Sequence, residues 1–546
     1  MYFKIKTIIS GIFLLVSINS TFLSAQERIT TNDKLVFHHI VVNKNGEIEP
    51  WYDENPGISY DHIIDIVWSF WDTMRTDYNG LPYYMNHSVW VRDKNDSRGI
   101  AGDQFAMALS SWQLLYQYTG NMRVSENMNF IADYYLEHSL SSPSDVWPNI
   151  PYPSATLRYS GRYDGDMILG KNFTQPDKAG SFGFELIKLY KMSNYKQRGT
   201  RYLDAAIEIA NTLAKNCRKG DDKNSPLPFR VNAVTGEIGP LLAYGKNRYK
   251  DIIVTGKAGY TTNFSGTLGL FLELIKMEKG NTGLYQKAFD QIIDWMKEYP
   301  LKTNKWGPFF EDMPGWSDTQ INPITFAWFM MKHPEYFHNW KSEVPKIFDW
   351  VYATLENNRW AKYGVTTVNE QTTCMEPANS HNSRQACAEL LYCKLSGDSS
   401  RHNHAVRLLN WATYSVNTTG ENRFNGKSVW LSDGYGDYIR HYLRAMAIDS
   451  TLSDPNENHI LKSSSILTEI EYADNTHEEL VIQYRSYDES GSESIRMTTK
   501  PSKVVIDNIE IPENHKSGNC WVWNHMEKGG LLVIKRSNGL LIKIFR

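Results

Sequence analysis

The sequence predicts a mostly α-helical protein, in which a closed ring of six helical hairpins is followed by a small all-β antiparallel domain. Two observations predict the ring. From residue 59 to residue 389, apolar residues recur at spacings of three and four, which is the helical period. The connections alternate between short turns that contain glycine and long irregular loops. Short β-branched runs after residue 450 predict the β domain.

The composition is that of an ordinary globular protein with one large and one small domain. The 546 residues are 41% hydrophobic and 22% charged, which excludes a disordered, collagen-like or disulfide-dense chain. With 58 basic and 61 acidic residues, the chain has no global field that attracts nucleic acid. The 17 Trp and 32 Tyr fit either aromatic faces that line a sugar-binding cleft or an aromatic-rich core.

The first 25 residues predict a secretory signal peptide. A basic start is followed by a short apolar stretch, and the small pair Ser24 and Ala25 precedes the expected cut. The apolar stretch, at roughly 10 residues, is too short to span a bilayer, and no later run is long enough. We therefore expect a periplasmic or secreted protein without a membrane span, and one of its five cysteines at least must be unpaired.

Twelve helical segments are predicted between residues 26 and 450. They lie near residues 59–75, 101–119, 122–140, 179–193, 200–216, 263–278, 282–298, 322–333, 340–357, 381–396, 400–416 and 434–448. Segments that follow the long loops, such as 264–269, are apolar or small on every side, as inner helices must be. Segments that follow the short turns carry one charged face and form an outer layer. The first helix is then an outer one that pairs with the last and closes the ring.

This order resembles the (α/α)6 barrel of bacterial polysaccharide-processing enzymes, the six-hairpin glycosidase superfamily, over roughly residues 50 to 450. That class includes unsaturated glucuronyl hydrolases, other exo-acting uronidases and several polysaccharide lyases. The resemblance implies an enzyme of carbohydrate degradation whose substrate is an oligosaccharide or polysaccharide.

Residues 451–546 predict a separate antiparallel sandwich. Four β-branched runs, at 469–472, 480–484, 503–506 and 531–534, are broken by Gly, Asn and Asp. Similar tail domains follow helical barrels in exported glycan enzymes, as the resemblance implies. Trp521 and Trp523 either bind a ligand or pack against the barrel.

In such a ring, the long loops and the first turns of the inner helices face one mouth, where helix N-termini favour an anionic ligand. Five carboxylates in these segments are the catalytic candidates: Asp103, Asp166, Glu311, Asp312 and Asp437. Asp103 equally fits a helix cap. Glu311 and Asp312 lie among aromatic residues, which either raise one pKa for a general acid and stack on sugars, or hold the segment as a lid.

Polar and aromatic residues of the same segments are expected to bind the substrate. They are Trp90, Arg92, Asp93, Arg230, Tyr260, Asn263, Trp306, Trp316, His381, Arg384 and Arg440. His381 and Arg384 lie one helical turn apart, so they share a face on which a carboxylate can be clamped. Asn263 also fits a helix cap. Several arginines beside several acids suit a substrate that carries both hydroxyls and a carboxylate, as a uronate does.

Other chemistries lack their motifs. The chain has no glycine-rich phosphate loop with its lysine, no zinc-type His-Glu helix pair and no Gly-x-Ser-x-Gly elbow. We therefore expect no cofactor and find no metal-ligand spacing, although a calcium site built from loop carboxylates stays open.

These observations favour a glycoside hydrolase, of the exo-acting uronidase kind. Glu311 or Asp312 would protonate the leaving oxygen, with Asp103, Asp166 or Asp437 as the second carboxylate; their separation decides between retention and inversion. One alternative is a polysaccharide lyase that uses Tyr260, Asn263, His381 and Arg384 for β-elimination. Another is a non-catalytic glycan-binding protein, which a Glu311→Gln variant would distinguish from an enzyme.

Overall fold

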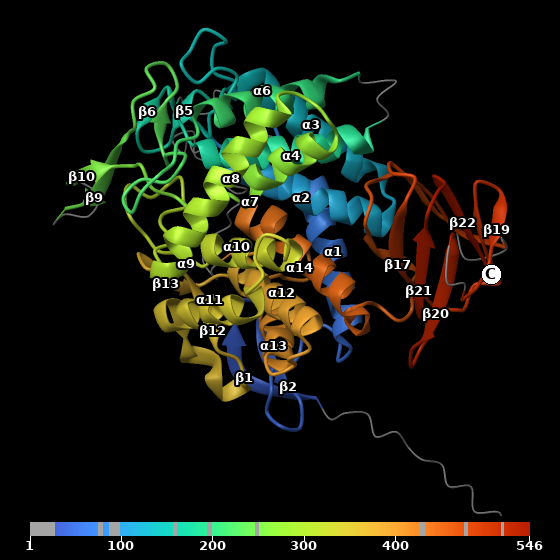
Figure 1. Ribbon diagram of the computed structural model, residues 1–546. Coiled ribbons are helices and arrows are strands. Elements are labelled where there is room, and N and C mark those ends of the chain that lie inside the picture. The colour runs from blue at the N-terminus through green and yellow to red at the C-terminus, as the bar shows by residue number, and fades with distance from the viewer. Residues whose placement is uncertain are drawn as a thin grey trace, which may run out of the picture.

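The structure is a computed structural model, and it describes residues 28–74, 80–86, 99–156, 161–193, 199–245, 251–424, 432–473, 479–514 and 518–546. The predicted signal peptide at residues 1–25 lies outside these ranges, as do Trp90, Arg92 and Asp93. A ring of helices forms most of the molecule, and a β-sandwich lies at one side of it (Figure 1).

All twelve predicted helices are present, and they form two concentric layers. The inner helices are α2 (Gly102–Thr119), α4 (Pro176–Met192), α7 (Ser265–Lys276), α10 (Ile321–Lys332), α12 (Asn379–Ser396) and α14 (Asp437–Ile448). The outer helices are α1 (Pro56–Asp72), α3 (Met122–Ser139), α6 (Arg201–Asn216), α8 (Thr282–Glu298), α11 (Trp340–Leu355) and α13 (His402–Thr413). Each inner helix contacts the next, and α14 contacts both α2 and α1. The predicted closure, and with it the (α/α)6 barrel, is confirmed.

The residue patterns explain the two layers. In the inner helix α12 every residue from Asn379 to Cys393 is buried, whereas the outer helix α6 buries one stripe that includes Tyr202 and Ile209. Small residues bring inner helices close together. A Cβ atom at Gly180 of α4 would overlap the Thr267 side chain of α7, so only glycine fits at this contact.

The β domain after the barrel consists of two antiparallel sheets. One has the order β14 (His459–Ser463), β17 (Gly491–Met497), β21 (Gly530–Arg536), β20 (Cys520–His525). The other has the order β15 (Leu467–Tyr472), β16 (Leu480–Ser486), β22 (Leu541–Phe545), β18 (Lys503–Ile506), β19 (Ile509–Ile511). Trp521 is buried and its indole N–H donates to the Ile511 carbonyl at 3.2 Å. It therefore packs inside the sandwich.

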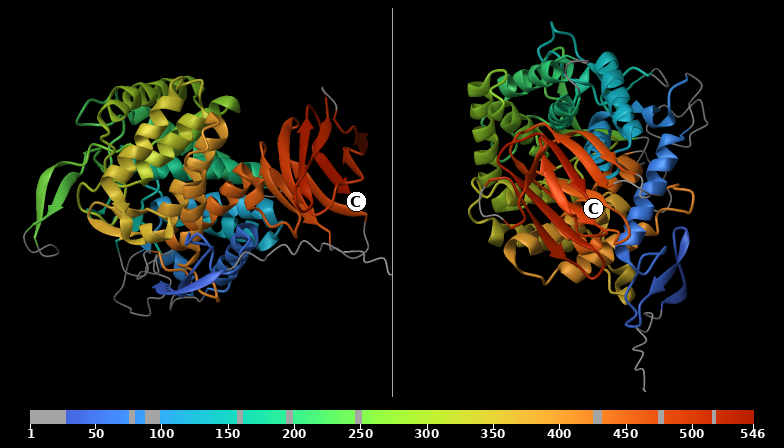
Figure 2. Two further views of the ribbon diagram at one scale, coloured as in Figure 1. Left: turned by 90° about the horizontal axis from the view of Figure 1, so that it is seen from below. Right: turned by 90° about the vertical axis from the view of Figure 1, so that its right-hand side faces the viewer.

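The sandwich lies over the end of the ring where the inner helices finish (Figure 2). Strand β14 contacts α2, and β15 contacts α4. On the opposite side projects a hairpin that the sequence did not predict, formed by β9 (Pro240–Tyr244) and β10 (Ile252–Lys257) (Figure 1). The sandwich and the helix N-termini thus mark opposite ends of the barrel.

Several smaller elements fill the long loops. They are β1 (Ile29–Leu35), β2 (His38–Val42), β3 (Gly99–Ile100), β4 (Ser154–Ala155), β5 (Gly165–Asp166), β6 (Gly170–Lys171), β7 (Phe173–Thr174), β8 (Val231–Asn232), α9 (Pro300–Thr303), β11 (Glu356–Asn357), β12 (Thr367–Gln371) and β13 (Cys374–Pro377). Within the described ranges no helix is long and apolar enough to cross a membrane. All five cysteines are free thiols.

The sandwich contains a fully buried ion pair that yields a stability prediction. Arg536 Nη2 lies 2.9 Å from Glu493 Oε1, and neither side chain is exposed. Because Glu493→Ala leaves a buried guanidinium without its counter-charge, we expect the free energy of unfolding to fall by about 3–5 kcal/mol. Urea denaturation followed by tryptophan fluorescence measures this loss. Glu510→Ala, at an exposed position of β19, is the matched control, and equal loss in the two variants would contradict the prediction.

Candidate active site

The segment 306–316 covers the mouth of the barrel, which is the end where the inner helices begin. Trp306 is fully buried, and its carbonyl accepts hydrogen bonds from Thr262 Oγ1 at 2.5 Å and Asn322 Nδ2 at 3.1 Å. Phe309 and Phe310 are buried in a small apolar cluster with neighbouring helix residues. The aromatic residues of this segment therefore hold it to the barrel as a lid, and the expected stacking of sugars on Trp306 does not fit its burial.

A second interaction fixes the same segment from the other side. Arg230 and Asp166 are both fully buried, and Arg230 Nε lies 2.8 Å from Asp166 Oδ2. Arg230 Nη2 donates to the carbonyl oxygens of Glu311 at 2.8 Å and Met313 at 3.0 Å. Asp166 also accepts from the Gln175 amide at 2.6 Å. Both residues thus act as a support for the lid, and Arg230 Nη1 alone of the three guanidinium nitrogens has no acceptor among the described residues.

The lid places Glu311 against the first turn of α2, beside Asp103. The Asp103 N–H donates to Glu311 Oε1 at 3.2 Å, although the two residues are 208 positions apart in the sequence. Glu311 thereby satisfies one of the free N–H groups of the helix, and the side chain of Asp103 does not cap it. A Cβ atom at Gly102 would lie 2.5 Å from Glu311 Oε1, so this approach requires glycine.

Asp103 and Glu311 form a buried carboxylate pair. Burial, the neighbouring charge of Asp103 and a hydrogen bond with it raise the pKa of Glu311 well above its usual range. Only 5% of Asp103 and 4% of Glu311 is exposed. The raised pKa favours the protonated form of Glu311 beside the Asp103 carboxyl group.

Beside this pair lie a lysine and an aspartate that the sequence reasoning missed. Lys178 is 2% exposed, its Nζ lies 3.8 Å from Asp177 Oδ2 and 3.0 Å from the centre of the Phe309 ring. No hydrogen-bond acceptor for this Nζ is found among the described residues. Asn263 donates to Asp177 Oδ2 at 3.1 Å and does not cap α7 as expected. The sequence signal for these two residues is that Asp177 and Lys178 are adjacent charged residues at the start of the inner helix α4.

Asp437 has the opposite electrostatic environment. At the start of α14 it pairs with Arg384 and Arg440, and His441 Nε2 lies 3.3 Å from its Oδ1. Burial alone would raise the pKa of Asp437, but the two arginines outweigh it and hold the pKa well below its usual range. Asp437 is therefore an ionised structural anchor, and the carboxylate that Arg384 clamps belongs to the protein itself.

The remaining predicted residues lie around this cluster. His381 is fully buried between the rings of Phe310 and Phe424, and neither ring nitrogen has a hydrogen-bond partner in the described structure. Burial and then the charge of Arg384 lower its pKa well below its usual range, so the imidazole is neutral. Tyr260 donates its hydroxyl to the Lys305 carbonyl at 2.7 Å and packs against the half-buried Trp316.

A cavity of about 300 Å³ runs along the barrel axis below the pair. At the mouth its wall includes Asp103, Asn263, Phe309, Arg384 and Arg440. Towards the other end it includes Glu185, Lys188, Trp328, Lys332 and Arg444. We call this space the axial cavity. Of the predicted site residues, four line it: Asp103, Asn263, Arg384 and Arg440. The other described ones are not on its wall: Asp166, Arg230, Tyr260, Trp306, Glu311, Asp312, Trp316, His381 and Asp437.

The far end of the axial cavity is strongly basic. Lys332 Nζ and Arg444 Cζ lie 5.6 and 5.2 Å from the centre of the Trp328 ring, and within the described ranges neither has a carboxylate at ion-pair distance. Burial and then the charges of Lys462 and Arg444 lower the pKa of Lys332, and burial and Arg440 lower the pKa of Arg444 to about 10. An anion placed here would relieve this repulsion.

Comparison with known proteins shows the fold of the barrel. The sequence matches no family model and no curated protein. Among solved structures, cellobiose 2-epimerase from Spirochaeta thermophila is similar with a TM-score of 0.54 at 12% identity, over 72% of this chain and 96% of that one.

Two further solved structures are similar over the same region. A sugar epimerase from a ruminal bacterium has a TM-score of 0.50 at 14% identity, over 71% of this chain and 97% of its own. A D-mannose isomerase has a TM-score of 0.50 at 8% identity, over 72% and 96%. At these identities the similarity shows the architecture of a carbohydrate-processing class of enzymes and no particular reaction.

The support of the lid by Arg230 is testable. Arg230→Met removes the donors that hold the Glu311 and Met313 carbonyls and leaves Asp166 buried without its counter-charge. We expect faster amide hydrogen exchange in a peptide spanning residues 306–316, together with a lower melting temperature. Arg218→Met, at an exposed position, is the control. Unchanged exchange in the Arg230 variant would show that the aromatic residues hold the lid alone.

The raised pKa of Glu311 predicts a pH dependence of stability. The folded state binds the Glu311 proton more tightly than the unfolded chain, whose pKa is near 4.5. Unfolding therefore releases a proton above that pH, and wild type loses stability as the pH rises towards the raised pKa. Glu311→Gln lacks this proton, so its melting temperature should decline less between about pH 5 and about pH 8. Glu510→Gln is the reference variant. If the melting temperatures of wild type and Glu311→Gln fall equally with rising pH, the raised pKa of Glu311 is contradicted.

Proposed function

We propose that the protein is an exported glycoside hydrolase that removes a terminal acidic sugar, of the uronate type, from oligosaccharides. The Asp103–Glu311 pair is its acid–base centre, and the axial cavity holds the acidic sugar. The predicted signal peptide at residues 1–25 would direct the chain out of the cytoplasm. One observation carries the proposal: Asp103, in contact with a buried Glu311 whose pKa is raised, lies on the wall of a cavity with basic residues at its far end.

The pair can donate one of the protons that hydrolysis moves and accept the other. Asp103 faces the axial cavity and would contact the substrate, while Glu311 lies behind it under the lid. The pair donates its proton to the substrate, and the carboxylate that remains accepts a proton from the attacking water. The carboxylate pair of a retaining glycosidase is roughly 5–5.5 Å apart and that of an inverting one roughly 6.5–9.5 Å apart, so two adjoining carboxylates match neither arrangement. We therefore propose that Asp103 and Glu311 work as one acid–base unit and that water is the nucleophile.

The lining charges support an acidic sugar. Arg384 and Arg440 share one carboxylate, that of Asp437, and Lys188 is paired with Glu185 at 2.7 Å. Lys332 and Arg444 remain to bind a carboxylate. Arg444 donates to Ser110, which lies on α2 about 10 Å along the helix from Asp103. One sugar ring with its carboxylate fits between these two positions.

The size of the axial cavity supports action at a chain end. Its volume of about 300 Å³ is at the lower limit for small-molecule sites. The lid closes the mouth above it, because Phe309, Phe310 and Glu311 are all buried. A long polysaccharide would need an open groove, whereas one terminal unit needs only this enclosed space.

A lyase is the second candidate, and His381 favours it. Its neutral imidazole has both ring nitrogens without a hydrogen-bond partner in the described part of the chain, as a general base requires. Arg384, one helical turn away, would lie beside the uronate carboxylate. In this reaction the sugar chain is cut by elimination and no water is consumed.

The deciding experiment is a time course on uronate-containing oligosaccharides, read by product mass and by ultraviolet absorbance. Hydrolysis gives products heavier by one water and no rise in absorbance, and we expect Asp103→Asn and Glu311→Gln to lower kcat at least 100-fold. Glu510→Gln should retain full activity.

The other outcomes contradict the proposal in distinct ways. Rising absorbance, lost in His381→Ala but retained in Asp103→Asn, would show elimination. Conversion without any change in mass or absorbance would show the isomerisation chemistry named for the epimerases and the mannose isomerase of this fold. Glycan binding without turnover in wild type would show a binding protein.

A further inference from the structure

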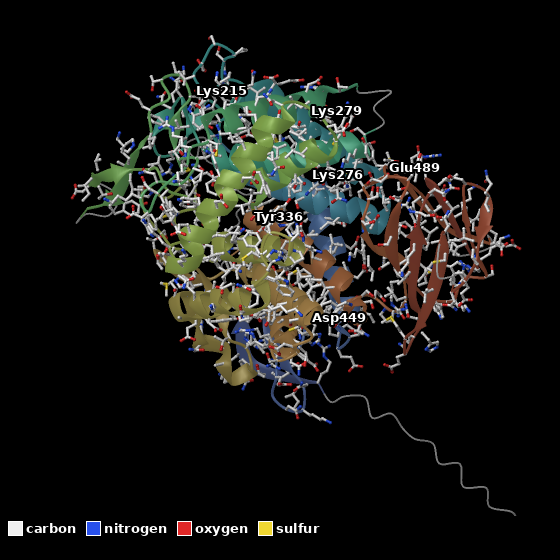
Figure 3. The ribbon with its side chains drawn as sticks, viewed as in Figure 1. Lys215, Lys276, Lys279, Tyr336, Asp449 and Glu489 are labelled. Atoms are coloured by element: carbon white, nitrogen blue, oxygen red, sulfur yellow. The ribbon has the colours of Figure 1, made fainter. Side chains whose placement is uncertain are left out.

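Three side chains of metal-ligating type meet where the barrel joins the sandwich. Asp61 lies on α1, His459 begins β14, and Glu457 lies just before it. One ligand atom from each can be chosen so that all three lie within 4.8 Å of one another. Figure 3 labels Asp449, at the end of α14, from which the chain leads to this cluster. The cluster is separate from the axial cavity and its carboxylate pair.

The imidazole of His459 is held in one orientation and one tautomer. Its Nδ1 lies 2.9 Å from the carbonyl oxygen of Tyr118 in α2. A carbonyl oxygen only accepts hydrogen bonds, so Nδ1 carries the hydrogen and Nε2 of the neutral ring presents a lone pair. The ring also stacks on Tyr118, with centroids 3.7 Å apart and planes 10° apart. A backbone carbonyl on the second ring nitrogen is the usual outer contact of a metal-bound histidine.

The lone pair of Nε2 points into the cluster and is not satisfied by the protein. This atom is buried and has no hydrogen-bond partner in the described structure, and only 10% of the His459 side chain is exposed. It lies 3.4 Å from Glu457 Oε2 and 3.7 Å from Asp61 Oδ1. Ligands placed tetrahedrally around zinc, each about 2.1 Å from the ion, lie about 3.4 Å from one another. The imidazole nitrogen is therefore spaced for a common ion with each carboxylate, and the two carboxylates lie within 4.8 Å of each other.

The two carboxylates complete a consistent ligand set. Asp61 is held by the hydroxyl of Tyr118, which donates to its Oδ1 at 2.8 Å. The Glu457 side chain is 61% exposed, so the site opens to solvent on that side. One imidazole and two carboxylates match the preferences of zinc-type divalent ions, with water in the open position.

We propose that Asp61, Glu457 and His459 bind a divalent cation of the zinc class. The ion would join α1 and α2 to the chain segment that enters the sandwich, so its effect is on the stability of this junction. Close packing already exists there, because a Cβ atom at Gly57 of α1 would overlap the Ser453 carbonyl. The proposal does not depend on the enzymatic function proposed above.

The test is zinc binding by the full chain, purified without a metal-binding tag and stripped with a chelator. Isothermal titration with Zn²⁺ should give one site per chain, and the melting temperature should rise with zinc. Glu457→Gln, at an exposed position that folding tolerates, should weaken zinc binding at least tenfold. His459→Gln should abolish the site.

His402→Gln is the matched control. His402 pairs with Asp449 at 2.8 Å, a single carboxylate, so this variant should bind zinc as wild type does. A protonated His459 that simply bridges two carboxylates would give no zinc uptake beyond that of His459→Gln, and that result would overturn the proposal. Equal zinc affinity in wild type and Glu457→Gln would also overturn it.

Discussion

The buried contact between Arg230 and Asp166 is the constraint on which the candidate site depends. It joins the loop before α4 to the loop before α7, and the same guanidinium holds two carbonyl groups of the lid. A buried ion pair of this kind is costly to break, because either partner alone would be a buried, uncompensated charge. The lid is therefore anchored to the barrel at this point. Glu311 lies in that lid, so its position beside Asp103 depends on the guanidinium that binds its own backbone carbonyl.

The protein contains similar carboxylates in opposite electrostatic states, and the difference comes from their neighbours. Glu311 and Asp437 are both buried at the mouth, where desolvation favours the neutral acid. At Glu311 a second carboxylate adds to that effect, whereas at Asp437 two arginines reverse it. A proton is therefore available at one side of the axial cavity, and fixed charge at the other. Acid–base chemistry in one site requires carboxyl groups whose pKa values differ in this way.

The sequence allowed the barrel to be predicted but only part of the site. The twelve helices followed from periodicity, because each buries either one stripe or its whole surface. The contact between Asp103 and Glu311 did not, because 208 residues separate them and a distant lid decides their proximity. Asp166 has the residue type and loop position of a catalytic acid, and only the position of Arg230 shows it to be a support. Lys332 and Arg444 lie towards the C-terminal ends of α10 and α14, far from the mouth to which the loop pattern assigns the site.

The position of the sandwich bears on the far end of the axial cavity. Five residues, Phe184, Lys188, Trp328, Lys332 and Arg444, line both this cavity and a second one of about 430 Å³ between the barrel and the sandwich. The second cavity is also lined by Lys462 and Asp488 of the sandwich, and by Lys276 of α7, labelled in Figure 3. Seven basic and two acidic side chains line it, so the positive field extends across the interface. The sandwich therefore forms part of the electrostatic environment of the barrel, and the junction that holds the two together also sets how an anion at Arg444 is screened from solvent.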